Sequence, residues 1–193
     1  MATWYDGLCD CLGDAAAHEL VEWANSDSAL VLAHLSRLTK PQIICLRAYT
    51  ISRKRDGLTI FQRINNRLRF PDQSTSATEP LDALIVTLIA AIDDLPVWTG
   101  PAYRRTNLPA HVLEEARTGS FADAGFLSCT TRSGLNLFGG RDWLVLRSKS
   151  GRRIGGCSAN PDEEEVIFRP NTRFRVSRLE ETPDGVTIIL NEV

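Results

Sequence analysis

The spacing of apolar residues changes near residue 96, and this change limits the folds open to the chain. Upstream, Phe61, Ile64 and Leu68 recur at intervals of three and four, which is typical of an amphipathic helix. Downstream, apolar residues come in short runs separated by turn residues, which is typical of strands. Helices followed by strands predict an α+β protein.

The first half contains several segments with helix signals. Asp14 and then Ser26 or Asp27 are suitable N-caps, and Pro41 suits the first turn of a further helix. We expect helices at residues 15–23, after Ser26 or Asp27 through leucines 30, 32, 35 and 38, from residue 41, at 61–69 and at 81–94, with a loop at 52–57 and a polar linker at 71–80.

The second half alternates strand signals with turns. We expect strands at residues 97–104, 126–131, 143–146, 166–168, 172–176 and 186–190, and a short helix at 111–118 that ends at Gly119. We interpret residues 1–193 as a single domain with a helical part at 1–95 and a β-rich part at 96–193. Neither part would easily bury a core of its own at this length.

Composition and charge argue against several classes of function. A formal net charge of −2 argues against binding nucleic acid through overall charge. Five cysteines without a Cys-x-x-Cys pair, and three scattered histidines, predict no metal site. The longest apolar stretch, residues 81–92, contains Asp82 and is too short to span a bilayer, so no membrane segment is expected. The start has neither a basic cluster nor an apolar run, so no cleavable signal is expected.

Three consecutive glutamates, Glu163, Glu164 and Glu165, run directly into the strand signal Val-Ile-Phe at 166–168. If this stretch is an extended strand, Glu163 and Glu165 share one face and Glu164 points away. Placing two carboxylates together in a buried strand costs free energy, and a chain keeps such a pair where a positive charge is to be held. The alternative is a solvated acidic loop, which is the more common meaning of such a fragment taken alone.

Three further patterns precede the glutamates. They are Tyr103-Arg104-Arg105, Phe126-Leu127-Ser128-Cys129-Thr130 and Phe138-Gly139-Gly140-Arg141. Each has an ordinary structural interpretation, because Arg104 could pair with a core carboxylate and Ser128 could be a plain strand hydroxyl. Their order, spacing and strand context point instead to one shared site.

Taken together, these motifs resemble the mono-ADP-ribosyltransferases of the arginine-serine-glutamate class, which include cholera toxin and the enzymatic components of clostridial binary toxins. The flanking residues 46–50, 61–69, 151–154, 158–161 and 169–176 are also similar, so the resemblance covers residues 42–178. It implies a split, two-sheet β core of the ADP-ribosyltransferase type behind the N-terminal helices. It also implies that three motif strands surround NAD, which is a substrate, and that no metal is used.

The resemblance implies a role for each matching residue on the first strands. Arg104 corresponds to the strand arginine that holds NAD and supports the site, and Arg105 matches a second arginine of binary-toxin enzymes. Ser128 would orient the catalytic glutamate by a hydrogen bond, and Thr130 would support the same strand. Cys129 departs from the family pattern, which has threonine at this position, and we expect the change to be tolerated.

The loop and glutamate motifs receive roles in the same way. Phe138 would cover the nicotinamide and Arg141 would bind the pyrophosphate, while residues 155–162 would recognise the target. Glu165 aligns with the catalytic glutamate, whose charge stabilises a sugar carbon that becomes cationic as nicotinamide leaves. Glu163 aligns with the residue that engages the acceptor, and glutamate at that position goes with arginine as the acceptor.

The resemblance therefore predicts an enzyme that transfers ADP-ribose from NAD to an arginine of a target protein, acting as a bacterial toxin or effector. A cognate immunity protein or a chaperone is a further expected partner, and secretion by a signal-independent system would bring the protein to the target-cell cytosol. Three alternatives stay open: an NAD glycohydrolase, transfer to a non-arginine or nucleic-acid acceptor, and a binding module without catalysis. The net charge and Glu163 argue against the nucleic-acid acceptor.

Overall fold

The structure is a computed structural model that describes residues 2–29, 37–73, 78–135 and 139–193. The chain divides into two compact units. The helical unit comprises Met1–Pro96 and Ile154–Pro161, and the β unit comprises Val97–Arg153 and Asp162–Val193. The division at residue 96 follows the change in sequence pattern. The return of Ile154–Pro161 to the helical unit was not expected from the sequence.

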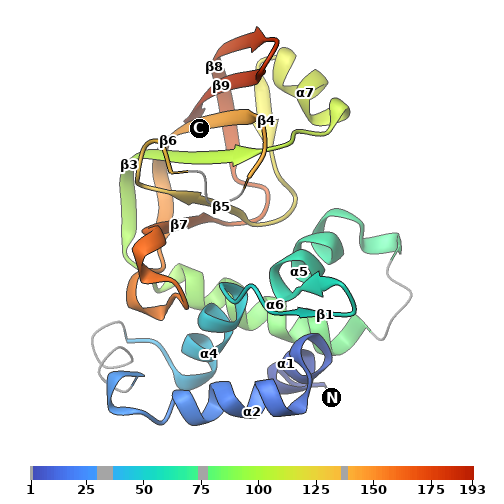
Figure 1. The fold of residues 1–193 in the computed structure, drawn as a ribbon, viewed down its shortest axis with the longest axis vertical. Helices are drawn as coiled ribbons and strands as arrows, with labels where there is room; N and C mark the ends of the chain where they lie inside the picture. The colour runs from blue at the N-terminus through green and yellow to red at the C-terminus, as the bar shows by residue number, and fades with distance from the viewer. Residues whose placement is uncertain (1, 30–36, 74–77, 136–138) are drawn as a thin grey trace. The chain divides into compact units, whose positions relative to one another are not determined.

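Within the helical unit, amphipathic helices enclose an apolar core (Figure 1). The helices are α1 (Trp4–Leu12), α2 (Asp14–Trp23), α4 (Lys40–Tyr49), α5 (Ile60–Arg69) and α6 (Thr78–Asp93). Thr39 and Thr59 begin α4 and α5 with capping boxes, in which the threonine hydroxyl and a glutamine three residues later satisfy free backbone groups. Helix α6 packs against α1 and α4. At Gly7 a side chain would lie 2.1 Å from the Pro80 carbonyl oxygen, so glycine allows α1 and α6 to touch.

Most expected helices are present, with local differences. Helix α2 starts at Asp14 itself, and it is preceded by α1, which was not expected from the sequence. The expected loop at 52–57 is a hairpin of β1 (Lys54–Arg55) and β2 (Leu58–Thr59), with Asp56 and Gly57 at φ of 51° and 82° in its turn. Leucines 30, 32 and 35 of the helix expected after Ser26 lie outside the described residues, as do residues 74–77 of the expected linker.

The β unit contains one continuous network of strands and a short helix (Figure 1). The elements are β3 (Val97–Thr106), α7 (Ala110–Arg117), β4 (Ser120–Ala122), β5 (Leu127–Thr130), β6 (Asp142–Arg153), β7 (Glu165–Phe168), β8 (Arg173–Thr182) and β9 (Gly185–Glu192). The order is β3-β5-β7-β6-β9-β8-β4, with β3 also paired to β6. Strand β4 was not expected, and β6 is much longer than the predicted 143–146.

The network folds into two layers that share the long strand β6. One layer contains β3, β6, β9, β8 and β4, and the other is formed by β5 and β7, which pair with β3 and β6. Leu144, Leu146 and Ile188 of the first layer and Val166 and Phe168 of the second belong to one buried core. The prediction of an α+β protein with a split, two-sheet β core is confirmed.

Candidate active site

The pairing of β5 with β7 brings two predicted site residues to neighbouring positions. Thr130 lies opposite Glu165, and Ser128 lies opposite Ile167. Because Cys129 and Val166 point into the apolar core and strand residues alternate, Ser128, Thr130 and Glu165 share the other face of this layer. Strand pairing therefore fixes the catalytic-glutamate candidate beside its predicted serine partner.

Glu165 is a buried carboxyl group whose surroundings bring its pKa close to neutral pH. Its side chain is only 6% exposed. Burial above all, with repulsion from Glu163, raises the pKa of Glu165 to about 7, although a hydrogen bond from Ser128 and the positive charge of Arg104 act to lower it. Near neutral pH this carboxyl therefore responds strongly to charge, and a cation placed beside it would favour the ionised form.

Arg104 connects β3 to the same site. Its Nη1 donates a hydrogen bond to the carbonyl oxygen of Ser128 at 2.6 Å. The guanidinium also lowers the pKa of Glu165 and, to a lesser degree than burial raises it, that of the Cys129 thiol. A planar guanidinium with several donors fits phosphate and ribose oxygens, so the predicted set of Arg104, Ser128 and Glu165 is brought together.

Arg105 points away from Arg104, because neighbouring residues of a strand face opposite sides. Its guanidinium carbon lies 4.3 Å from the centre of the Trp143 ring, in a cation–π contact. Its Nε is buried and has no hydrogen-bond partner among the described residues. The two arginines of the motif thus do not share one location on β3, and the NAD-binding role of Arg105 stays a prediction.

Glu163 lies in a turn before strand β7, whereas the sequence predicted that it belongs to the strand. It ends the 3₁₀ turn η3 (Pro161–Glu163), and Glu164 follows at a φ of 45° in the left-handed region. Strand β7 begins only at Glu165, so the expectation that simple strand alternation places Glu163 and Glu165 on one face is wrong. The two carboxylates still interact, because Glu163 raises the pKa of Glu165. Partial burial also raises the pKa of Glu163 itself.

The remaining predicted site residues are Thr130, Arg141 and Phe138, and the structure describes the first two. The Thr130 hydroxyl donates to the carbonyl oxygen of Glu163 at 2.7 Å and so supports the turn before β7. Arg141 is exposed, with its backbone N–H donating to Asn107 Oδ1 at 3.1 Å and its Nε 3.7 Å from Asp142 Oδ1. Phe138 lies outside the described residues. The roles of all three in binding NAD stay predictions.

Asp142 is buried beside Arg141 and was not expected from the sequence to have a role. Its two carboxylate oxygens accept hydrogen bonds from the backbone N–H groups of Leu108 at 2.8 Å and Val186 at 3.0 Å. Asp142 therefore anchors the start of β6, directly after Arg141. A lone aspartate before the strand signal at 143–146 gave no sign of this role.

In the helical unit, α4 holds the segment expected to recognise the target. Arg47 stacks on the Trp23 ring at 4.1 Å, and its Nη1 donates to the carbonyl oxygen of Ser158 at 3.1 Å. The Ala159 N–H donates to Thr50 Oγ1 at 2.7 Å. The Leu-Arg-Ala-Tyr-Thr motif at 46–50 thus has a structural task that its sequence did not reveal.

No group of three or more His, Cys, Asp and Glu side chains in the described part of the chain could hold a metal ion. Among the helices of the described ranges, none has the length and apolar character that crossing a bilayer requires.

The geometry of the β unit suits one kind of chemistry. A buried carboxylate, oriented by a hydroxyl, can stabilise positive charge that develops at a neighbouring sugar carbon. Arg104 adds a donor group for phosphate or ribose oxygens, and Glu163 adds a second carboxylate at the edge of the site. These are the parts that cleavage of a nucleotide glycosidic bond needs.

Comparison with known proteins gives a consistent family. A family model described as NAD:arginine ADP-ribosyltransferase matches residues 14–193. The chain is 32% identical over 186 residues to the NAD(+)–protein-arginine ADP-ribosyltransferase Tre1 of Serratia proteamaculans, a match that covers 95% of this chain and 39% of that protein. The chain spans between 16% and 57% of the length of four curated relatives.

Solved structures show the same fold. ADP-ribosyltransferase HopU1 of Pseudomonas syringae superposes with a TM-score of 0.75 at 17% identity, covering 91% of this chain and 87% of that one. ADP-ribosyltransferase Vis, solved in complex with agmatine, superposes with a TM-score of 0.65 at 24% identity, covering 91% of this chain and 85% of the Vis chain. A Vis protein of Vibrio splendidus is also among the curated relatives.

Proposed function

Because the chain belongs to the NAD:arginine ADP-ribosyltransferase family, we propose that it transfers ADP-ribose from NAD to an arginine side chain of a target protein and releases nicotinamide. The observation that carries this proposal is the buried Glu165 carboxyl, which accepts a hydrogen bond from Ser128 and lies in the field of Arg104. The names of the relatives describe the same activity.

Glu165 would serve the bond-breaking step. The glycosidic bond breaks with its electron pair moving to the nicotinamide nitrogen, so nicotinamide leaves as a neutral molecule and needs little acid catalysis. The positive charge passes to the ribose, where an ionised Glu165 stabilises it. Ser128 holds the carboxylate in one orientation, so little reorganisation is needed as the charge develops.

Arg104 would serve binding. NAD presents two phosphates and two riboses, and a guanidinium can donate paired hydrogen bonds to such oxygens. One Nη of Arg104 donates to the Ser128 carbonyl, which fixes the side chain, and the planar guanidinium carries several N–H donors in all. The residues present therefore fit the dinucleotide.

Glu163 would serve the acceptor. A carboxylate can bind a guanidinium by two hydrogen bonds and can accept the proton that this group loses when its nitrogen bonds to the ribose carbon. Burial raises the pKa of Glu163, which makes it a better proton acceptor than an ordinary surface carboxylate. The transfer step balances, because the acceptor nitrogen gains ADP-ribose and loses one proton to Glu163 as nicotinamide leaves.

The direct test uses agmatine, a small guanidinium compound that a structure of Vis contains. The purified chain is incubated with NAD and agmatine, and the products are identified by mass spectrometry. ADP-ribosylated agmatine supports transfer to arginine. Nicotinamide release without that product, in the presence of excess agmatine and of a cell lysate, would contradict it.

The second candidate is an NAD glycohydrolase. The group formed by Glu165, Ser128 and Arg104 lies within the β unit and can assist loss of nicotinamide whether water or a guanidinium then attacks. The same incubation separates the two activities, because hydrolysis yields free ADP-ribose. Transfer to a non-arginine or nucleic-acid acceptor would give labelled macromolecules without labelled agmatine.

The biological role that we propose is that of a bacterial toxin or effector. A structural relative, XopAI of Xanthomonas axonopodis, is named as a type III effector, which supports this role. The partners would be the target protein and a cognate immunity protein or chaperone, the route a signal-independent secretion system, and the place of action the target-cell cytosol. Growth arrest on expression of the chain in bacteria, absent for Glu165→Gln, would support toxicity, and equal growth would contradict it.

A further inference from the structure

The short turn that contains Glu163 and Glu164 is held by the end of strand β5. Each of the three successive carbonyl groups of residues 162–164 accepts a hydrogen bond from residues 130–132. The donors are Thr130 Oγ1 to Glu163 at 2.7 Å, the Thr131 N–H to Glu164 at 3.2 Å and Arg132 Nη1 to Asp162 at 3.1 Å. The turn is therefore fixed along its whole backbone by one neighbouring segment.

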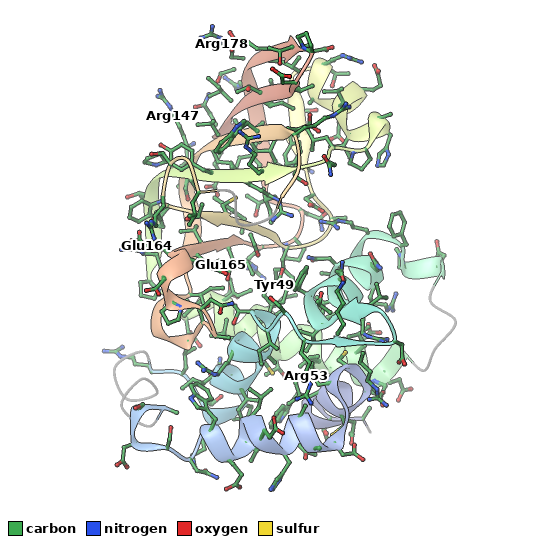
Figure 2. The ribbon with its side chains drawn as sticks, in the orientation of Figure 1. Tyr49, Arg53, Arg147, Glu164, Glu165 and Arg178 are labelled. Carbon is green, nitrogen blue, oxygen red and sulfur yellow. The ribbon has the colours of Figure 1, made fainter. Side chains whose placement is uncertain are left out.

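Side chains reinforce this connection. The Thr131 hydroxyl also donates to Glu164 Oε2, and Arg153 Nη2 lies 3.9 Å from the same oxygen. The Arg132 N–H donates to Thr130 Oγ1 at 3.1 Å, which orients that hydroxyl toward Glu163. Figure 2 labels Glu164 and Glu165 close together in the view, and of the two Glu164 is exposed whereas Glu165 is buried.

The hydrogen bonds from residues 130–132 are needed for stability, because Glu164 adopts a backbone conformation that glutamate rarely takes. Its φ of 45° lies in the left-handed region, where a residue other than glycine needs support from its surroundings. Without the bonds to residues 130–132, the turn would relax toward commoner conformations. Glu163 sits directly before this residue, so its carboxylate would then lose its fixed direction.

Glu165 does not depend on the same support. It belongs to the β5–β7 ladder opposite Thr130, and its carboxyl accepts a hydrogen bond from Ser128. Loosening the turn at 162–164 would therefore disturb Glu163 far more than Glu165. The two carboxylates are positioned by separate sets of contacts.

Given the transferase activity proposed above, we propose that Thr131 and Arg132 are positioning residues that aim the Glu163 carboxylate at the acceptor guanidinium. They touch neither acceptor nor NAD in this mechanism and act through the turn. A proton acceptor must lie within hydrogen-bond reach of its proton, and small displacements of such groups reduce rates severely. Acceptor transfer thus depends on a threonine and an arginine that follow the Ser-Cys-Thr motif.

The test compares two rates in the same proteins. Thr131→Val removes the hydroxyl at similar volume, and Arg132→Met removes the bond to Asp162 while keeping a long side chain. For the double variant we expect transfer to agmatine to fall about tenfold, less than the roughly 10²-fold loss from removing a general base outright. Hydrolysis of NAD without acceptor should stay within about twofold, because Glu165 keeps its partners.

Matched variants separate positioning from general stability. Thr172→Val deletes a hydroxyl that donates to the Arg169 carbonyl oxygen at 2.8 Å in an exposed turn of the same unit, and it should leave both rates unchanged. Thr131→Ser, with Arg132 unchanged, keeps the hydroxyl that Thr131→Val deletes and should keep most of the transfer rate. Thermal unfolding of each variant shows whether the unit stays folded.

The outcomes are decisive in each direction. A selective loss of transfer in the double variant, with transfer retained in Thr131→Ser, supports the proposal. Equal losses of transfer and hydrolysis, or unchanged transfer in the double variant, overturn it while leaving the transferase function intact. Wild-type protein that hydrolyses NAD but labels no agmatine overturns the proposed function first, and this proposal with it.

Discussion

The β5–β7 ladder and the turn before β7 place two glutamates close together by opposite means. In the ladder, Glu165 is buried, regular in backbone and paired across to Thr130. In the turn, Glu163 is partly exposed and is followed by a left-handed residue. The ladder supplies a carboxylate in a water-poor setting, whereas the turn supplies one that a large acceptor can approach.

This difference divides the chemistry between the two regions. A charge that stabilises a cationic sugar acts most strongly where solvent is excluded, which describes Glu165. A group that accepts a proton from an incoming protein side chain must be reachable, which describes Glu163. Variants that affect one region and spare the other test whether the division is real.

The largest effect should come from removing the charge in the ladder. Glu165→Gln keeps the shape and a hydrogen-bond acceptor for Ser128 but removes the anion. We expect nicotinamide release, with or without agmatine, to fall by about 10²–10³ because preorganised charge is lost. NAD binding, measured by calorimetry, should change little. Turnover close to wild type would remove Glu165 from the chemistry.

The turn should respond selectively. Glu163→Gln should reduce transfer to agmatine by about 10²-fold, since the proton acceptor is lost, while hydrolysis of NAD falls by less than about threefold. Both rates come from one assay that quantifies ADP-ribosylagmatine and free ADP-ribose. Glu115→Gln, on α7 of the same unit, makes the same charge change away from the site and serves as the control. Parallel loss of both products in Glu163→Gln would contradict separate roles.

The pH dependence of NAD hydrolysis should follow the ionisation of Glu165 in the β5–β7 ladder. Glu165 acts ionised, and its pKa of about 7 predicts that NAD hydrolysis falls about tenfold from pH 8 to pH 6. Ser128→Ala removes the hydrogen bond that lowers this pKa, so its profile should shift to higher pH. Initial rates across this range give the midpoint. A flat profile, or a shift to lower pH in Ser128→Ala, would show that another group controls the rate.

The stability of the folded protein should also depend on pH through Glu165. The pKa of Glu165 rises from its ordinary 4.5 to about 7 in the folded protein, so the folded state binds the proton more tightly than the unfolded state. The buried carboxyl therefore favours folding below about pH 4.5, and this contribution is lost as pH rises to about 7. The loss is on the order of 1–3 kcal/mol.

Glu165→Gln is neutral at every pH and escapes this loss. Its melting temperature should exceed that of the wild type by several degrees at pH 8, and the difference should shrink at pH 5. The measurement is thermal unfolding of both proteins in matched buffers. An equal difference at both pH values would mean that Glu165 titrates as it does in the unfolded chain.

The ladder was more predictable from the sequence than the turn. Ser128 and Glu165 stand in strand signals that the family resemblance links, although the β5–β7 register depends on residues far apart in the chain. Nothing in three consecutive glutamates before Val-Ile-Phe signals a left-handed residue, because glycine, the usual marker, is absent. The strand interpretation of Glu163 failed for that reason.

The other differences between prediction and structure also separate into local features and contacts between distant residues. The Asp56-Gly57 turn and the Thr3 capping box of α1 have local sequence signals, so both could be predicted from the sequence. The attachment of residues 154–161 to α4 is different, because the Arg47 bond to Ser158 joins residues 111 positions apart. Helix and strand types follow from local pattern, whereas these attachments arise only once the chain has folded.

The smallest effect should come from the residue between the site positions of β5. Cys129 is fully buried, belongs to the apolar core and faces away from Ser128 and Thr130, and burial raises the pKa of its thiol to about 12. Cys129→Ala should therefore leave transfer and hydrolysis within about twofold, while the small cavity lowers stability by about 1 kcal/mol. Kinetics with agmatine and a denaturant titration measure the two effects. A large kinetic change at unchanged stability would mean that the core face of β5 also takes part in the reaction, and the ladder could no longer be treated as having one active face.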